Sequence, residues 1–277
     1  MIDAIFEPLS YGITLRALAE ITLIGIVSGA IGCWIVLYEL SYSAESLAHG
    51  LFPGLVAAAL IGAPLLLGGA VGILIAAILV VVAGRMAGES PDTAIAVVIT
   101  SLFGAGVLMA LSPDSPAGLQ GLLFGDLLGT TVTDILVAAV IGSAVLVALW
   151  LLHERLLAVG FDPGSGPALG VPVGVLNLIL LGLVATTILV AVQGLGNLLV
   201  AAILVGPAAA ARLLTRRVWP MILAAGAVAV TAGVAGIYAS YYLKTAAGAS
   251  VVIALVLCYL LAAAAAQLRD RTAAVRH

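Results

Sequence analysis

The chain has 277 residues, of which 64% are hydrophobic and 8% are charged, and its formal net charge is −3. Soluble domains carry about 25% charged residues, so this composition excludes a water-soluble globular protein and indicates an integral membrane protein. Aromatic residues make up 5% of the chain, while alanine, leucine, valine and glycine dominate, which favours a helix bundle over a membrane β-barrel. The sequence also lacks a basic patch of the kind that binds nucleic acid.

Apolar runs of spanning length, separated by glycine, proline or charged residues, predict the membrane spans. We predict an all-α polytopic protein with about nine transmembrane helices in a single domain over residues 1–277, because no linker or internal repeat divides the chain. A merged or re-entrant pair would change the count, so eight to ten spans fit the pattern. The predicted spans are Leu15–Leu37, Ala44–Ile61, Leu65–Val82, Thr93–Leu111, Val132–Leu152, Val173–Val192, Leu195–Leu214, Met221–Tyr242 and Ser250–Leu268.

The basic residues give the expected orientation. Eight of the ten follow the third, fifth, seventh and ninth predicted spans, and Arg16 and Lys244 lie at the opposite ends. Because cytoplasmic loops are enriched in Lys and Arg, we predict an N-terminus outside the cell and a C-terminus in the cytoplasm. The eight are Arg85, Arg155, Arg212, Arg216, Arg217, Arg269, Arg271 and Arg276.

The segment Ser41–Gly54 interrupts the apolar pattern. Glu45 and His49 are four residues apart and would lie on one helix face, and Pro53, four residues further on, cannot donate a hydrogen bond to the carbonyl of His49. We therefore predict a helix break at Pro53, with a carboxylate, an imidazole and a free carbonyl converging as ligands for zinc, manganese or ferrous iron. The alternative is a buried structural pair. The functional reading is favoured because ionisable residues in lipid usually mark a pathway.

Two glycine stripes and one outer loop complete the first half of the chain. Gly25 with Gly29, and Gly68 with Gly72, are spaced to let helix backbones approach closely. The stretch Leu122–Gly129 is too short to span, so we predict an interfacial or re-entrant piece in which Asp126 is a helix-end group rather than a ligand.

The cytoplasmic loop at residues 161–172 is the second informative segment. Asp162 is a candidate N-cap before Pro163, and Gly170 and Pro172 are helix-stop residues. These signals predict a very short helix that docks on another protein, with an ordinary surface turn as the alternative. Lys244 is the only lysine and follows no glycine-rich loop, so the chain has no Walker A motif and cannot hydrolyse ATP as a P-loop enzyme.

Several motifs in the same order make the chain resemble the membrane permeases of metal-uptake ABC transporters, which import zinc, manganese or iron. The resemblance covers nearly the whole chain. It departs in having Glu45 where the family usually has Asp, and Tyr38-Glu39-Leu40 where the family has a basic pair. The motifs that carry the resemblance are Ser41–Gly54, Ser90–Ala96, Leu123–Gly129, Phe161–Pro163 with Ala168–Pro172, Leu204–Leu214 and Ser240–Tyr242.

The resemblance implies a fold like that of type II ABC importers, in a bacterial plasma membrane. It also implies a homodimer or heterodimer with a second permease copy, a cytoplasmic ABC ATPase dimer and an extracytoplasmic metal-binding protein. On this pattern Glu45 and His49 contact the transported zinc or manganese, or iron, and residues 162–170 form the coupling helix. Phe161 and Leu169 are the expected apolar anchors on the ATPase.

Two other functions fit the same residues. A proton-coupled secondary transporter would use Glu45 and His49 as a proton relay, and a membrane scaffold would keep them as a structural pair. An odd span count without visible inverted repeats weighs against the secondary transporter.

Overall fold

The computed structural model describes residues 7–87, 91–112, 119, 121–162, 170 and 172–274, and the described residues form helices joined by short connections. All nine predicted spans fall on long helices, which confirms the predicted all-α class. Short pieces are η1 (Pro8–Ser10), α6 (Gly121–Phe124) and η2 (Leu127–Gly129). The long helices are α2 (Gly12–Leu37), α3 (Ser41–Ile61), α4 (Leu65–Ala87), α5 (Pro91–Ala110), α7 (Val132–Phe161), α8 (Val173–Leu195), α9 (Asn197–Leu214), α10 (Val218–Leu243) and α11 (Ala247–Ala274).

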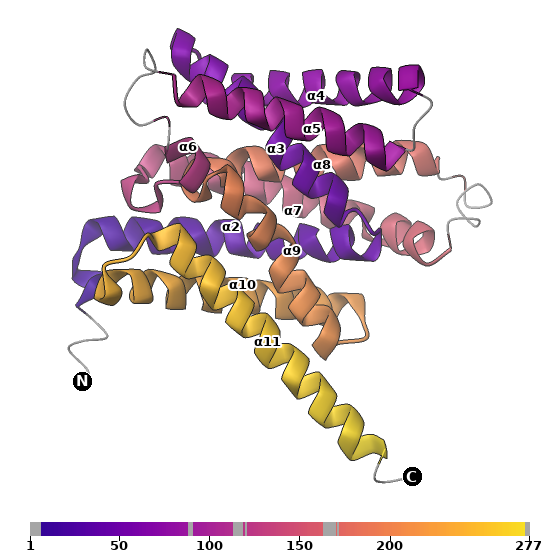
Figure 1. Cartoon of the computed structure of the whole chain (residues 1–277). Coiled ribbons are helices and arrows are strands. Elements are labelled where there is room, and N and C mark those ends of the chain that lie inside the picture. Colours follow the sequence, from indigo (N-terminus) through magenta and orange to yellow (C-terminus); the bar gives the residue numbers. More distant parts are fainter. Residues whose placement is uncertain are drawn as a thin grey trace.

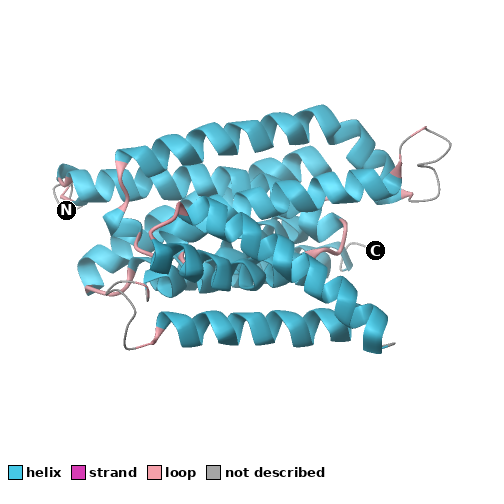
Figure 2. Cartoon of the chain, turned by 90° about the horizontal axis from the view of Figure 1, so that it is seen from above, coloured by secondary structure: helices cyan, strands magenta, loops and turns pink. Residues whose placement is uncertain are grey.

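Eight of these helices are long and apolar enough to cross a membrane within the described part of the chain. The ninth, α5, contributes a shorter apolar stretch, Ile95–Ala110. The protein is therefore a multi-pass membrane protein with eight to nine membrane helices, within the predicted range. Figure 2 shows α2 beginning and α11 ending toward opposite ends of the bundle.

The helices form two groups that meet at α8 and α9 (Figure 1). In one group α2 packs against α7, α9 and α10, and α11 crosses α9 and α10 obliquely before its C-terminal half leaves the bundle. In the other group α3 packs against α4 and α5, while α3 also contacts α8 and α9. Helix α3 therefore lies at the seam between the two groups.

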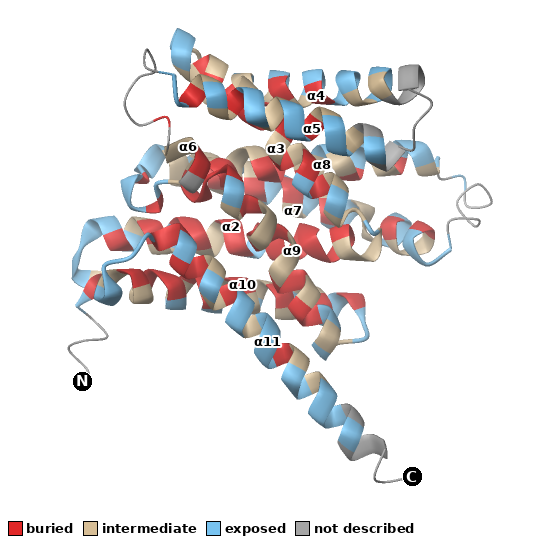
Figure 3. Cartoon of the chain, viewed as in Figure 1, coloured by how far each residue is buried: buried red, intermediate tan, exposed pale blue. Residues whose placement is uncertain are grey.

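Burial separates core helices from those that face lipid (Figure 3). In the most apolar 18-residue window of each helix, 72% of α2 is buried but only 17% of α4. The exposed faces of α4, α7 and α11 carry large apolar side chains such as Leu74, Val140 and Leu261. Such faces suit contact with lipid tails, which explains why the sequence is apolar on nearly every side.

The glycine stripes pack helix backbones together, as predicted. A Cβ atom on Gly32 would lie 2.0 Å from the carbonyl oxygen of Leu204 on α9, and one on Gly29 would lie 2.8 Å from the backbone of Gly226 on α10. Gly72 on α4 is equally close to Leu51 on α3, with 2.8 Å from its added Cβ to the carbonyl oxygen. Since helix association in lipid depends on close packing, these glycines set where α2 and α4 can sit.

The connection at residues 121–131 folds back onto the helices. Asp126 is the N-cap of η2 and accepts a hydrogen bond from the backbone nitrogen of Gly129 at 2.9 Å, so it is a helix-end group, as predicted. Gly125 (φ +76) packs against the α8–α9 junction, where an added Cβ would lie 2.2 Å from the backbone carbon of Leu195. The non-helical backbone at that junction is thus covered by protein rather than lipid.

Helix α7 is longer than its predicted span. The apolar run ends near Leu152, but the helix continues to Phe161, and Leu156 and Val159 are buried on its inner face. The segment His153–Arg155 ends the lipid-compatible stretch without breaking the helix, because glutamate and arginine are good helix formers. The charged residues Glu154 and Arg155 therefore indicate where α7 leaves the lipid, not where the helix ends.

Candidate metal-binding site

Helix α3 places Glu45 and His49 on one face, as their spacing predicts. The Nε2 atom of His49 lies 3.9 Å from Oε1 of Glu45. The side chain of Glu45 is 56% exposed and that of His49 is 24% exposed, so both remain open to a ligand. Because α3 begins at Ser41, His49 lies about 12 Å along a helix that is about 30 Å long. His49 therefore lies about two-fifths of the way along α3, whereas Glu45 lies in its second turn.

Pro53 does not break the helix, so that prediction is wrong. Helix α3 runs without interruption from Ser41 to Ile61 with Pro53 inside it. Helix α5 packs tightly here, since a Cβ on Gly106 would lie 3.0 Å from the nitrogen of Pro53, and α4 packs against Gly54. This packing keeps α3 helical at Pro53, although proline has no N–H to donate to the carbonyl oxygen of His49.

The two candidate ligands line a cavity of about 340 Å³ between α3 and α5. A volume of this size accommodates a hydrated cation. Its polar lining comes mainly from α3, with a hydroxyl from α5. The lining residues are Tyr42, Glu45, Ser46, His49, Ala96, Ile99, Thr100 and Phe103.

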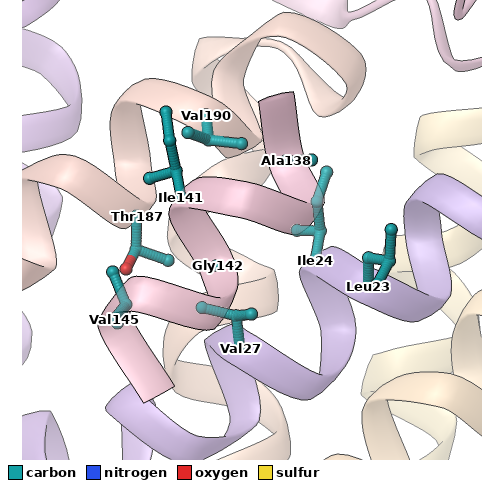
Figure 4. Close-up of a pocket in the computed structure, with 9 residues that line it drawn as sticks. All are labelled: Leu23, Ile24, Val27, Ala138, Ile141, Gly142, Val145, Thr187 and Val190. Atoms are coloured by element: carbon teal, nitrogen blue, oxygen red, sulfur yellow. The ribbon is translucent and has the colours of Figure 1, made fainter. Parts of the chain in front are cut away.

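The space between α2, α7 and α8 provides a contrast (Figure 4). Its nine lining residues include neither a carboxylate nor an imidazole, and its volume is about 10 Å³. The one hydroxyl, on Thr187, donates to the carbonyl oxygen of Leu183 at 2.8 Å. This space is a packing defect and has no ligands for a metal ion.

Two further residues hold the ring of His49, and the sequence did not predict either. Phe103 on α5 packs against it with ring centroids 4.8 Å apart and an interplanar angle of 50°. Asn197, the first residue of α9, places its Nδ2 atom 3.2 Å from Nδ1 of His49. The only sequence signal for Asn197 is a single amide near the start of an apolar span, which does not identify a partner 148 residues away.

One copy of the chain supplies an incomplete coordination shell. Among the described residues, no group of three or more His, Cys, Asp or Glu side chains is placed to hold a metal ion. Glu45 and His49 provide two ligands, whereas zinc takes about four and manganese or iron about six.

The predicted coupling residues are only partly described. Phe161 ends α7 and is 74% exposed. Asp162 occupies the C-cap of α7, with its backbone nitrogen bonded to the carbonyl oxygen of Ala158, and Gly170 has φ +67. Leu169 lies outside the described residues, so the predicted short helix and the N-cap role of Asp162 stay predictions.

Comparisons with known proteins identify the family. The model of the ABC 3 transport family matches residues 10–266. The chain is 33% identical to the manganese transport system membrane protein MntC of Halalkalibacterium halodurans, over 88% of this chain and 84% of that protein. It is 29% identical to the chelated iron transport system membrane protein YfeD of Yersinia pestis, over 95% of this chain and 88% of that protein.

Solved structures agree with the family. The structure of PsaBC from Streptococcus pneumoniae in complex with Fab matches with a TM-score of 0.88 and 29% identity, over 95% of both chains. A metal-chelate type ABC transporter in an inward-facing conformation has the same fold, with a TM-score of 0.70 and 13% identity over 95% of this chain and 89% of the other. The chain belongs to the ABC 3 transport family and is the membrane permease of an ABC transporter, whose ATPase is a separate subunit.

Proposed function

We propose that the chain is the permease of an importer that moves a divalent first-row metal ion, manganese or ferrous iron, into the cytoplasm. The observation that carries this proposal is the Glu45–His49 pair, which lines a cavity of about 340 Å³ together with the hydroxyl-bearing side chains of Tyr42, Ser46 and Thr100. A carboxylate oxygen and an imidazole nitrogen suit these metals, and they also accept zinc. The names of the relatives favour manganese or iron. Family membership sets aside the secondary transporter and the scaffold.

The incomplete shell supports a role for a second permease copy. The 56% exposure of Glu45 leaves its carboxylate available to a neighbouring subunit. A two-fold arrangement would bring the carboxylate and imidazole of each copy to a common ion, giving four protein ligands. The remaining positions would be filled by water or backbone carbonyls, as manganese and iron accept both.

The other partners follow from the architecture of ABC importers. A cytoplasmic ATPase dimer supplies the energy, because this chain has no Walker A motif. An extracytoplasmic metal-binding protein delivers the ion to the outer face in a bacterial plasma membrane. The docking surface for the ATPase is the segment 161–172, with Phe161 as its exposed apolar anchor.

Metal-stimulated ATP hydrolysis tests this function. The permease is reconstituted in proteoliposomes with its ATPase and binding protein, and hydrolysis and uptake are measured with Mn²⁺, Fe²⁺ and Zn²⁺. We expect stimulation by Mn²⁺ or Fe²⁺, and loss of uptake by more than about 100-fold in Glu45→Gln and His49→Ala, since even outer-shell changes cost about 10- to 100-fold in metal affinity.

His153 and Glu154 provide a matched control. They are an imidazole and a carboxylate on α7, and His153 packs between the rings of Trp34 and Trp219, away from the cavity. His153→Gln and Glu154→Gln should keep metal-stimulated hydrolysis. Normal uptake by the double variant of Glu45 and His49, at equal expression, would refute the assigned site. Stimulation by Zn²⁺ alone would refute the assigned metal.

A further inference from the structure

We propose that Asn197 is the positioning residue for His49. Its carboxamide binds the ring at Nδ1 and so leaves Nε2 as the nitrogen that faces Glu45 and the transported cation. This inference rests on the proposed function of the Glu45–His49 pair. It assigns a role to a residue on α9 that does not itself contact the ion.

The two ring nitrogens of His49 face different partners. Nδ1 lies 3.2 Å from the amide of Asn197, and Nε2 lies 3.9 Å from the carboxylate of Glu45. A neutral imidazole carries one proton, so the hydrogen bond at one nitrogen decides whether the other has a free lone pair. The hydrogen bond that Asn197 makes with Nδ1 therefore decides whether Nε2 can bind a metal ion.

A carboxamide can serve both states of the ring. With its Nδ2 toward the ring, Asn197 donates to Nδ1 only when the ring proton is on Nε2, facing Glu45, and we assign this arrangement to the site before metal binds. A half-turn of the amide presents Oδ1 instead, which accepts a proton from Nδ1 and leaves the lone pair of Nε2 for the cation. The ring carries one proton in both arrangements: water in the cavity accepts the proton from Nε2 and supplies the proton that Nδ1 takes up.

The side-chain oxygen of Asn197 supports this half-turn of the amide. Asn197 is completely buried, and its Oδ1 atom has no hydrogen-bond partner among the described residues. A buried carboxamide oxygen without a partner is costly. After the half-turn, Oδ1 of Asn197 accepts a hydrogen bond from the protonated Nδ1 of His49. Metal binding would therefore give this oxygen the hydrogen-bond partner that it otherwise lacks.

The backbone around Asn197 keeps the amide in place. Gly196 precedes it with φ 75 and ψ 161, a conformation that favours glycine, and this lets α9 begin directly after α8 ends at Leu195. The ring of Phe103 packs against His49 from α5. The imidazole is therefore held by contacts from both α5 and α9, as a preorganised ligand requires.

The test measures Cd²⁺ affinity and the protonation of the ring, without transport. The full chain, labelled with ¹⁵N-histidine, is reconstituted as a dimer in lipid nanodiscs and titrated with Cd²⁺, a diamagnetic probe. The chain has three histidines, and the signal of His49 is assigned from its loss in His49→Gln. The variants are Asn197→Leu, which removes the hydrogen bond, and Asn197→Asp, which keeps an acceptor at Nδ1. The control is Asn177→Leu on α8, whose Oδ1 is also buried and unpaired.

We expect Asn197→Leu to weaken Cd²⁺ binding by about 10- to 100-fold, and Asn197→Asp and Asn177→Leu to stay within about threefold of the unmodified chain. The Cd²⁺-bound spectrum should show a protonated Nδ1 and a coordinated Nε2. Equal affinity in Asn197→Leu, or a coordinated Nδ1, would overturn the inference. The spectrum of the unmodified chain decides the matter even if Asn197→Leu does not fold. Absence of Cd²⁺ binding in the unmodified chain would instead refute the proposed site.

Discussion

Gly54→Ala should destabilise the permease next to its candidate metal site. Gly54 follows Pro53 on α3, where the backbones of α3 and α4 touch. A Cβ atom at this position would lie 2.2 Å from the carbonyl oxygen of Gly68 and 2.8 Å from the backbone nitrogen of Gly72. Both are backbone atoms, so no side chain can rotate away to relieve the clash.

The distances set the size of the effect. Ordinary van der Waals contact begins at 3.4 Å, so α3 and α4 must separate by about 1.2 Å to accept the methyl group. A gap of about 0.5–1 Å already removes a quarter to a half of the dispersion energy of each contact that it opens. We therefore expect a loss of about 1–3 kcal/mol in the free energy of unfolding, as for other overpacked cores.

Gly182→Ala on α8 is the matched control. A Cβ atom there meets nothing within 4 Å, so the same change should be neutral or should stabilise the helix by up to about 0.5–1 kcal/mol. Both variants are unfolded by SDS in mixed micelles, and their midpoints are compared with that of the unmodified chain. An unchanged midpoint for Gly54→Ala would show that α3 and α4 do not cross at these glycines.

Two further predictions concern topology and coupling. In a background without native cysteines, Lys244→Cys should react with an impermeant thiol reagent from outside and Arg216→Cys should not, because the arginine distribution predicts that Arg216 lies in the cytoplasm. Labelling of both cysteines from one side would contradict this orientation. Phe161→Asp should leave a folded permease that no longer co-purifies with its ATPase, while Leu214→Asp on the same side should retain the ATPase. Retention by both variants would place the docking surface elsewhere.

The helices could be predicted because their signal is local. A span needs about 20 apolar residues, and each run in the sequence is bounded by glycine, proline or charge. The glycine spacing of Gly68 and Gly72 likewise predicted a close helix contact, though not the partner helix. The end of α7 was missed because the charges at His153–Arg155 report where lipid ends, while the helix continues to Phe161.

In the candidate site, too, the features with a local sequence signal could be predicted, and those that depend on helix packing could not. The Glu45–His49 pair was predicted because a separation of four residues on a helix fixes their common face. Asn197 was missed because its contact with His49 depends on how α9 packs against α3, which a single sequence does not specify. The break at Pro53 was wrongly predicted because the packing of Gly106 and Gly54 around that turn is also a tertiary property.

Tyr38 connects the helix that carries the candidate metal site to the end of α7, next to the proposed docking segment for the ATPase. Its hydroxyl donates to the carbonyl oxygen of Leu156 on α7 at 2.8 Å, and a Cβ on Gly160 would lie 3.0 Å from its ring. Burial raises the pKa of Tyr38 to about 12, so the hydroxyl remains a donor at any physiological pH. Tyr38 thus fixes the turn between α2 and α3 to the end of α7, where the proposed coupling segment begins.

This contact joins the start of α3, which carries the candidate ligands, to the proposed docking surface for the ATPase. Glu45 lies in the second turn of α3, just beyond that connection, while His49 is held on its other side by Asn197 of α9. We expect a movement of the end of α7 to be transmitted through Tyr38 to the start of α3. Because a transporter must change the geometry of its ligands to release its cargo, we expect release to begin where His49 parts from Asn197.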